Sequence, residues 1–171
     1  MEQNKSNYMV KSTGIKKRTV IFISGNGSNM KNLIKFSKIK NSPITVDLVI
    51  SSNKKSNALQ YLKKNEINFK VFKFKQKNKD EKKILDILKK KKTQLICLAG
   101  FMKILSRSFI KKFNGKILNI HPSLLPKYKG LNTHERAIIN KEKFSGCTVH
   151  LVNSKLDSGK IILQKKVRIN K

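Results

Sequence analysis

Short apolar runs of strand length alternate with helical patterns along most of this chain, and that alternation strongly limits how it can fold. The expected strands cover 19–24, 44–50, 69–74, 94–99 and 116–120, followed by 147–152 and 160–168. Helical spacing of apolar residues predicts helices over 30–36, 56–64, 80–91, 106–113 and 133–140. Strands that alternate with helices indicate a parallel sheet covered on both faces. The last two strands follow one another without a helix, so we expect that end to be antiparallel.

The length of 171 residues suits one domain with a substantial core. We therefore expect an α/β, Rossmann-like domain over 19–171, preceded by a flexible basic lead-in over 1–18. No apolar run approaches the roughly 18–20 residues of a membrane span, and we expect a cytoplasmic protein. Cys97 and Cys147 are too few to form a metal site alone, and their apolar surroundings predict buried thiols.

The chain is strongly basic, with 40 Lys and Arg against 9 Asp and Glu and a formal charge of +31. Of these cations 36 are Lys and 4 are Arg, whereas a nucleic-acid site usually favours the planar fork of Arg. Lys, Asn and Ile also have A+T-rich codons, so biased genome composition explains the excess without selection for binding. We expect no specific nucleic-acid partner, although nucleic-acid binding and attraction for anionic small molecules remain open alternatives.

Polar residues gather where expected strands end, which is where open α/β sheets bind ligands. The segment SGNGSN at 24–29 joins the first strand to the first helix, and its two glycines let the backbone approach a ligand. Free N–H groups at the start of that helix favour an anion such as phosphate. The alternative is a plain tight turn in which Ser28 caps the helix.

A second group of polar residues lies at the end of the strand expected over 116–120. Asn119 and His121 are two positions apart, so both project to one side. An amide beside an imidazole suits acyl transfer to an amine, because one stabilises an oxyanion and the other moves protons. Asp157, in a late loop, becomes relevant only if the fold brings it to His121. We expect His150 to be structural, and leave open whether His134 faces a ligand or the protein.

Five blocks then occur in order: ISGNGSN, LAGFMKILS, ILNIHPSLLPKYKGLNTHERAI, GCTVHLV and LDSGKIILQKKV. Together they closely resemble the phosphoribosylglycinamide formyltransferase family over about residues 18–167. The resemblance implies transfer of a formyl group from 10-formyltetrahydrofolate, a co-substrate, to the amine of glycinamide ribonucleotide in purine biosynthesis, with no metal. The wider superfamily offers the alternatives of methionyl-tRNA formyltransferase and formyltetrahydrofolate hydrolase.

The resemblance also implies roles for individual residues. Asn119, His121 and Asp157 match the catalytic trio, and Gly27, Ser28 and Asn29 match the loop that holds the nucleotide phosphate. The residues that match folate contacts are Lys77, Met102, Lys103, Ile104, Leu105, Asn119, Asn153, Ser154, Lys155, Leu156 and Asp157.

The chain departs from the family pattern at two places. Lys160 stands where the family usually has Pro, and the sequence ends at Lys171 where family members continue into a region that supplies ribose contacts. We therefore expect a truncated C-terminal end and weaker nucleotide binding. An inactive remnant stays open as an alternative, and the oligomeric state is unknown.

Overall fold

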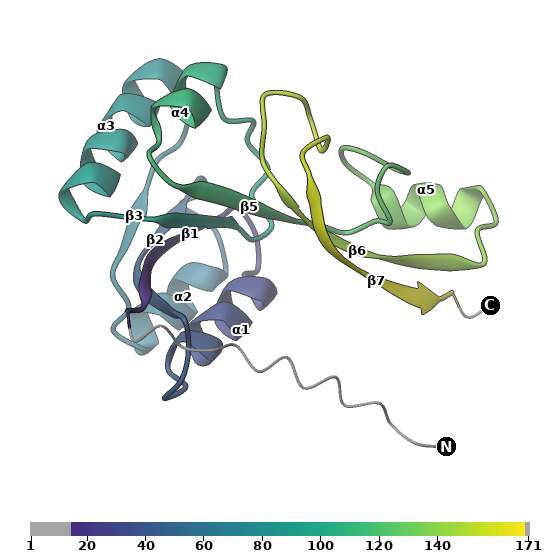
Figure 1. The fold of residues 1–171 in the computed structure, drawn as a ribbon, viewed down its shortest axis with the longest axis horizontal. Helices are drawn as coiled ribbons and strands as arrows, with labels where there is room; N and C mark the ends of the chain where they lie inside the picture. The colour runs from purple at the N-terminus through teal and green to yellow at the C-terminus, as the bar shows by residue number, and fades with distance from the viewer. Residues whose placement is uncertain (1–14, 170–171) are drawn as a thin grey trace.

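Seven strands form one mixed sheet in the order β3-β2-β1-β4-β5-β6-β7 (Figure 1). The computed structural model describes residues 15–169. The strands are β1 (Lys17–Ile23), β2 (Ile44–Ser51), β3 (Phe69–Val71), β4 (Leu95–Leu98), β5 (Lys116–His121), β6 (Phe144–Leu151) and β7 (Ile161–Arg168). The helices are α1 (Ser28–Ser37), α2 (Ala58–Lys64), α3 (Lys77–Lys90), α4 (Arg107–Lys112) and α5 (Thr133–Ile139).

Strand direction follows the connections between the strands. β1 pairs in parallel with β2 and β4, and the parallel set is completed by β2 with β3 and β4 with β5. β6 runs antiparallel to both β5 and β7. The expected fold class, including its antiparallel late strands, is therefore confirmed. β3 lies at one edge of the sheet and is shorter than the strand predicted over 69–74.

The core has two layers because successive residues of β1 point to opposite faces of the sheet. Val20 and Phe22 pack in a buried cluster with Ile84 of α3 and Phe109 of α4. Burying an apolar side chain of this size stabilises the fold by about 1.5–3 kcal/mol relative to exposure. α3 and α4 therefore cover this face of the sheet (Figure 1).

The opposite face of the sheet is covered by α1 and α2. Ile21 and Ile23 of β1 pack there with Met30 of α1 and Leu62 of α2, all of them fully buried. With helices on both faces, the central strands are apolar almost throughout, which explains why they stand out in the sequence. The loops at the strand ends are left to carry the polar residues.

The structure corrects three further details of the prediction. β1 begins at Lys17, earlier than the strand predicted from Thr19, and His121 is the last residue of β5 instead of the first residue of a loop. Cys97 is buried as expected, and burial raises the pKa of its thiol to about 11. Cys147 is exposed, because the alternation along β6 turns its neighbour Thr148 inward and Cys147 to the other side. The lead-in predicted over 1–18 lies largely outside the described residues.

Candidate active site

A cavity of about 880 Å³ lies beyond the carboxyl ends of β4 and β5, and most of the predicted site residues line it. They come from the segment after β4, the end of β5 and the loop between β6 and β7. They are Met102, Lys103, Ile104, Leu105, Asn119, His121, Asn153, Ser154, Lys155, Leu156 and Asp157. His134 also lines the cavity, whereas Gly27, Ser28, Asn29 and Lys77 do not.

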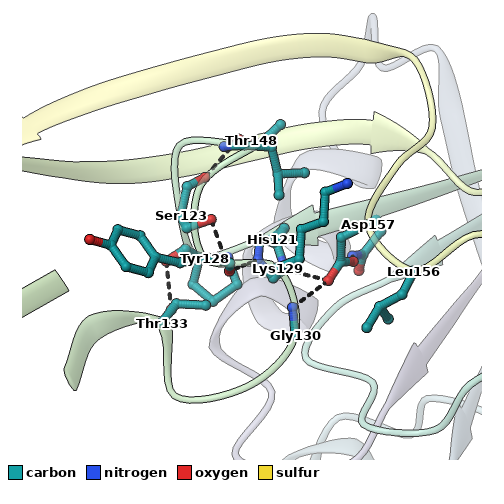
Figure 2. A network of polar contacts seen from close by, with 12 residues as sticks. His121, Ser123, Tyr128, Lys129, Gly130, Thr133, Thr148, Leu156 and Asp157 are labelled. Carbon is teal, nitrogen blue, oxygen red and sulfur yellow. Dashed lines mark hydrogen bonds and ion pairs between the residues drawn. The ribbon is translucent and has the colours of Figure 1, made fainter. Parts of the chain in front are cut away.

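His121 and Asp157 both line this cavity, and Figure 2 shows their contact. The Asp157 Oδ2 atom lies 3.4 Å from His121 Nδ1, and both side chains are largely buried. On the far side of the ring, His121 Nε2–H donates to the carbonyl oxygen of Tyr128 at 2.9 Å. The ring is therefore held in place by an acceptor beside each nitrogen.

The chain from His121 to Thr133 is held in shape by short hydrogen bonds (Figure 2). The Ser123 hydroxyl donates to the Lys127 carbonyl at 2.6 Å, and the Thr148 hydroxyl donates to the Ser123 carbonyl at 2.6 Å. At the start of α5, the Thr133 hydroxyl donates to the Pro122 carbonyl at 2.8 Å. These bonds fix the backbone that presents the Tyr128 carbonyl to His121.

Asn119 joins the same cluster through its side-chain amide. Its Nδ2 donates to Asp157 Oδ1 at 3.3 Å and lies 3.1 Å from His150 Nε2. A carboxylate only accepts hydrogen bonds, so the amide nitrogen and not the oxygen must face Asp157. Because the His150 Nδ1–H donates to the Leu151 carbonyl at 2.8 Å, a neutral His150 accepts at Nε2. Both N–H bonds of the Asn119 amide are then engaged.

His150 is the functional candidate that the sequence analysis missed. It was expected to be structural, yet it is 2% exposed and its Nε2 lies 3.5 Å from Asp157 Oδ1. The register of the antiparallel pair places it directly opposite Asn119. The only sequence signal was a histidine within an apolar strand, and its partner became visible only once the register was known.

The charges in the cluster shift two pKa values in opposite directions. In charged His150 the Nε2–H donates to Asp157 and no longer accepts from Asn119; this hydrogen bond raises the pKa of His150, and burial opposes the shift without cancelling it. For Asp157, burial disfavours the charged form, but hydrogen bonds from His150 and from the Gly130 N–H, together with the nearby His121, lower its pKa overall. The carboxylate is consequently ionised at neutral pH and forms the negative centre of the site.

Exposed apolar side chains surround the outer part of the cavity. Met102, Ile104, Leu131 and Leu156 are 67%, 67%, 69% and 53% exposed. Exposed apolar side chains grouped around a cavity indicate a site for a ligand with a flat or apolar part. Leu105 differs from its neighbours, because it is 6% exposed and belongs to the core.

The loop between β1 and α1 is built around Gly27, which has a φ of 74°. A Cβ atom added there would lie 2.7 Å from the Ala58 Cβ, so both conformation and packing require glycine. Gly27 also occupies the N-cap position of α1 and Ser28 is the first helical residue, so the alternative in which Ser28 caps the helix is wrong. Ser28 and Asn29 are exposed at the helix start, where backbone N–H groups lack helical acceptors.

Lys77, a predicted folate contact, is the first residue of α3 and is not among the residues that line the cavity. Within residues 15–169 no three His, Cys, Asp or Glu side chains are grouped as metal ligands are. Among the helices described for this chain, none has the length and apolar character needed to cross a membrane.

The sequence is similar to known proteins over most of its length. A family model described as formyl transferase matches residues 17–171. Phosphoribosylglycinamide formyltransferase of Haemophilus influenzae is 42% identical over 156 residues, which cover 90% of this chain and 74% of that protein. The human trifunctional purine biosynthetic protein adenosine-3 is 42% identical over 91% of this chain, but the chain spans only 16% of its length.

Solved structures agree with the sequence comparison. Phosphoribosylglycinamide formyltransferase from Brucella melitensis superposes with a TM-score of 0.83 at 43% identity, covering 90% of this chain and 81% of that one. The enzyme of the same name from Bacillus halodurans gives a TM-score of 0.85 at 34% identity, covering 91% and 81%. The resemblance inferred from the five sequence blocks is confirmed. The chain belongs to the formyl transferase family.

Proposed function

We propose that this protein transfers the formyl group of 10-formyltetrahydrofolate to the amine of glycinamide ribonucleotide, a step of purine biosynthesis. The observation that carries the proposal is the contact of Asn119, His121 and Asp157 in a cavity with an apolar rim. An amide, an imidazole and a carboxylate in contact are the groups that acyl transfer to an amine requires. The identity to proteins named phosphoribosylglycinamide formyltransferase supports this choice of substrates.

In the proposed reaction the substrate amine attacks the formyl carbon, and negative charge develops on the formyl oxygen. An Asn119 N–H bond stabilises that oxygen. When His150 is neutral, both Asn119 N–H bonds have acceptors in the protein, so one of them must turn toward the substrate. We assign this role to the N–H that faces Asp157, since its contact of 3.3 Å is the longer of the two.

His121 bears positive charge beside the oxyanion and relays a proton toward the folate nitrogen that leaves. Its Nδ1 contact with Asp157 at 3.4 Å is longer than the Nε2 bond to Tyr128 at 2.9 Å. Nδ1 is therefore the nitrogen that is freer to exchange a proton during the reaction. Asp157 is ionised and orients the ring, so it acts as the positioning group of the trio.

The substrates are assigned to two neighbouring regions. Met102–Leu105 and Asn153–Asp157 line the cavity and are proposed to hold the folate, with Lys103 and Lys155 near its carboxylates. Gly27, Ser28 and Asn29 at the start of α1 are proposed to bind the nucleotide phosphate. Lys77 stays a predicted folate contact, although it does not line the cavity. We infer action on small molecules in the cytoplasm, without a specific nucleic-acid partner.

A panel of formyl acceptors tests this function against its alternatives. The purified protein is incubated with 10-formyltetrahydrofolate and either glycinamide ribonucleotide, methionyl-tRNA or no acceptor, and tetrahydrofolate release is followed by absorbance. Release that depends on glycinamide ribonucleotide is expected. Release with methionyl-tRNA or without an acceptor would assign a superfamily alternative, and no release by folded protein would indicate an inactive remnant.

A further inference from the structure

The Ser24 hydroxyl lies between the segments assigned to the two substrates. Ser24 directly follows β1 and immediately precedes the turn before α1; this turn and the first two residues of the helix are together called the loop over 25–29. Its Oγ accepts a hydrogen bond of 2.8 Å from the backbone N–H of Met102, within the segment assigned to the folate. Its backbone N–H donates to the Gly100 carbonyl at 3.0 Å. Ser24 thus forms hydrogen bonds with the backbone on both sides of Phe101, at Gly100 and at Met102.

The surroundings of Ser24 make this link rigid. Ser24 is 8% exposed, and its Oγ also lies 2.6 Å from the Ser52 Oγ after β2. On the other side of the loop over 25–29, the Ser56 hydroxyl donates to the Gly25 carbonyl, and Asn57 Nδ2 donates to Asn26 Oδ1 at 3.1 Å. Hydrogen bonds therefore join the loop to residues that follow β2 and, through Ser24, to Met102, which follows β4.

Besides Ser24, the segment around Met102 is anchored by the packing of Phe101 against Phe22 and Phe74. Met102 and Ile104 are both 67% exposed, whereas Leu105 is buried. At its far end the segment is held by Ser106, whose N–H donates to the buried Glu81 carboxylate at 2.8 Å. The Glu81 anchor reaches α3 and does not touch the loop over 25–29. Among the side-chain hydrogen bonds of residues 15–169, the bond between Ser24 and Met102 is the one that joins the two segments, so movement of one segment is transmitted to the other through it.

We propose that Ser24 is a positioning residue that couples nucleotide binding to folate binding. Phosphate held at residues 27–29 shifts the segment that follows Ser24, and the rigid hydrogen bonds of Ser24 transmit this shift to the Met102 backbone, which then takes the conformation that accepts the folate. Coupling must be reciprocal, so folate binding strengthens nucleotide binding by the same factor. This inference rests on the proposed function for the identity of the two ligands.

The coupling is measured by calorimetric titration of tetrahydrofolate with and without saturating glycinamide ribonucleotide, a pair that cannot react. Saturation should tighten tetrahydrofolate binding by at least about fivefold in the wild-type protein. In Ser24→Ala the ratio of the tetrahydrofolate dissociation constants measured without and with the nucleotide should fall below about twofold. The matched control is Ser52→Ala, which removes a buried hydroxyl from the same pocket but keeps the bond between Met102 and Ser24. Its ratio should equal that of the wild type.

Hydrogen exchange gives a second measurement that does not depend on the substrates. The Met102 amide should exchange about 2- to 10-fold faster in Ser24→Ala than in the wild type, because it loses its acceptor. Inorganic phosphate should slow exchange over 101–105 in the wild type and in Ser52→Ala, but not in Ser24→Ala. If Ser24→Ala fails to fold, Ser24→Cys offers a weak acceptor of similar size and should behave alike.

Several results overturn the proposal. They are a wild-type protein with no coupling, a Ser24→Ala variant with full coupling, and a Ser52→Ala variant that loses as much as Ser24→Ala. If the wild-type protein transfers formyl groups without coupling, this inference fails while the proposed function stands. If it transfers none, the proposed function fails, and the effect of inorganic phosphate on exchange over 101–105 decides the inference by itself.

Discussion

Asp157 Oδ2 lies 3.4 Å from His121 Nδ1, although His121 ends β5 and Asp157 follows β6. The antiparallel pairing of β5 with β6 brings the two together, and the left-handed conformation of Asp157, with a φ of 43°, turns its carboxylate inward. The Gly130 N–H donates to the same oxygen at 2.9 Å and fixes its position. The arrangement holds an imidazole and an ionised carboxylate together in a largely buried site.

Removing the imidazole tests the role of His121. We expect His121→Ala to lower turnover by roughly 10²- to 10⁴-fold, because proton transfer in the transition state loses its carrier. Steady-state formyl transfer measures the loss, and calorimetry of tetrahydrofolate should show that the folate still binds. A folded variant with wild-type turnover would remove His121 from the mechanism.

Neutralising the carboxylate tests the electrostatics of the cluster. In Asp157→Asn the pKa of His150 should fall, because the hydrogen bond to Asp157 is the main cause that raises it. Titration of the histidine ring by NMR in both proteins gives the two values. An unchanged His150 pKa would show that the carboxylate does not interact with this ring. Turnover of Asp157→Asn should also fall, because His121 loses the carboxylate that orients it.

The same shift predicts how stability depends on pH. Because the pKa of His150 is raised in the folded state, its protonation stabilises the fold. This contribution is complete below the ordinary histidine value of 6.5 and is lost as pH rises through the folded-state pKa. The difference in unfolding free energy between the wild type and Asp157→Asn should therefore be larger near about pH 6 than near about pH 9. Urea unfolding at both pH values measures it, and a difference that grows with pH contradicts the assignment.

The loop before α1 provides a matched pair of glycine substitutions. Gly27→Ala should destabilise the protein by about 1–3 kcal/mol or more, because alanine must adopt a positive φ and its Cβ meets Ala58. Gly25→Ala is the control, since a Cβ there meets nothing within 4 Å. Urea unfolding should separate the two variants, and equal stabilities would disprove the packing argument.

The high positive charge leads to a prediction about nucleic acids. If the lysines reflect genome composition, the protein should bind duplex DNA of any sequence weakly and lose that binding steeply between roughly 50 and 200 mM salt. Fluorescence anisotropy with two unrelated duplexes measures this. A sequence-specific complex that persists at physiological salt would instead support a nucleic-acid function.

The sheet was largely predictable because its central strands are buried on both faces. The side chains of Val20 to Ile23 are fully buried on both faces of the sheet, so all of them are apolar and the strand is an unbroken apolar run in the sequence. β3 was overestimated because Phe72 and Phe74 pack against the core from irregular backbone and continue the alternation beyond the strand. Cys147 was wrongly assigned because the alternation of β6 gives the buried side to Thr148 and His150.

The site was predictable only in part. Asn119 and His121 lie on one strand, so their spacing placed them together, whereas Asp157 depended on the path of a later loop. His150 was missed because its contact with Asn119 arises from the register of an antiparallel pair, which residue spacing does not reveal. The link between Ser24 and Met102 likewise joins residues whose proximity follows from the pairing of β1 with β4.

The proposed function is tested most directly by the fate of a formyl group labelled with carbon-13 on 10-formyltetrahydrofolate. The label is followed by NMR as the wild-type protein turns over with glycinamide ribonucleotide, with His121→Ala as the inactive reference. We predict that the label appears in the amide of formylglycinamide ribonucleotide at a rate lower by roughly 10²- to 10⁴-fold in the variant. Label that stays on the folate, or is recovered as formate regardless of the nucleotide, would contradict the assignment.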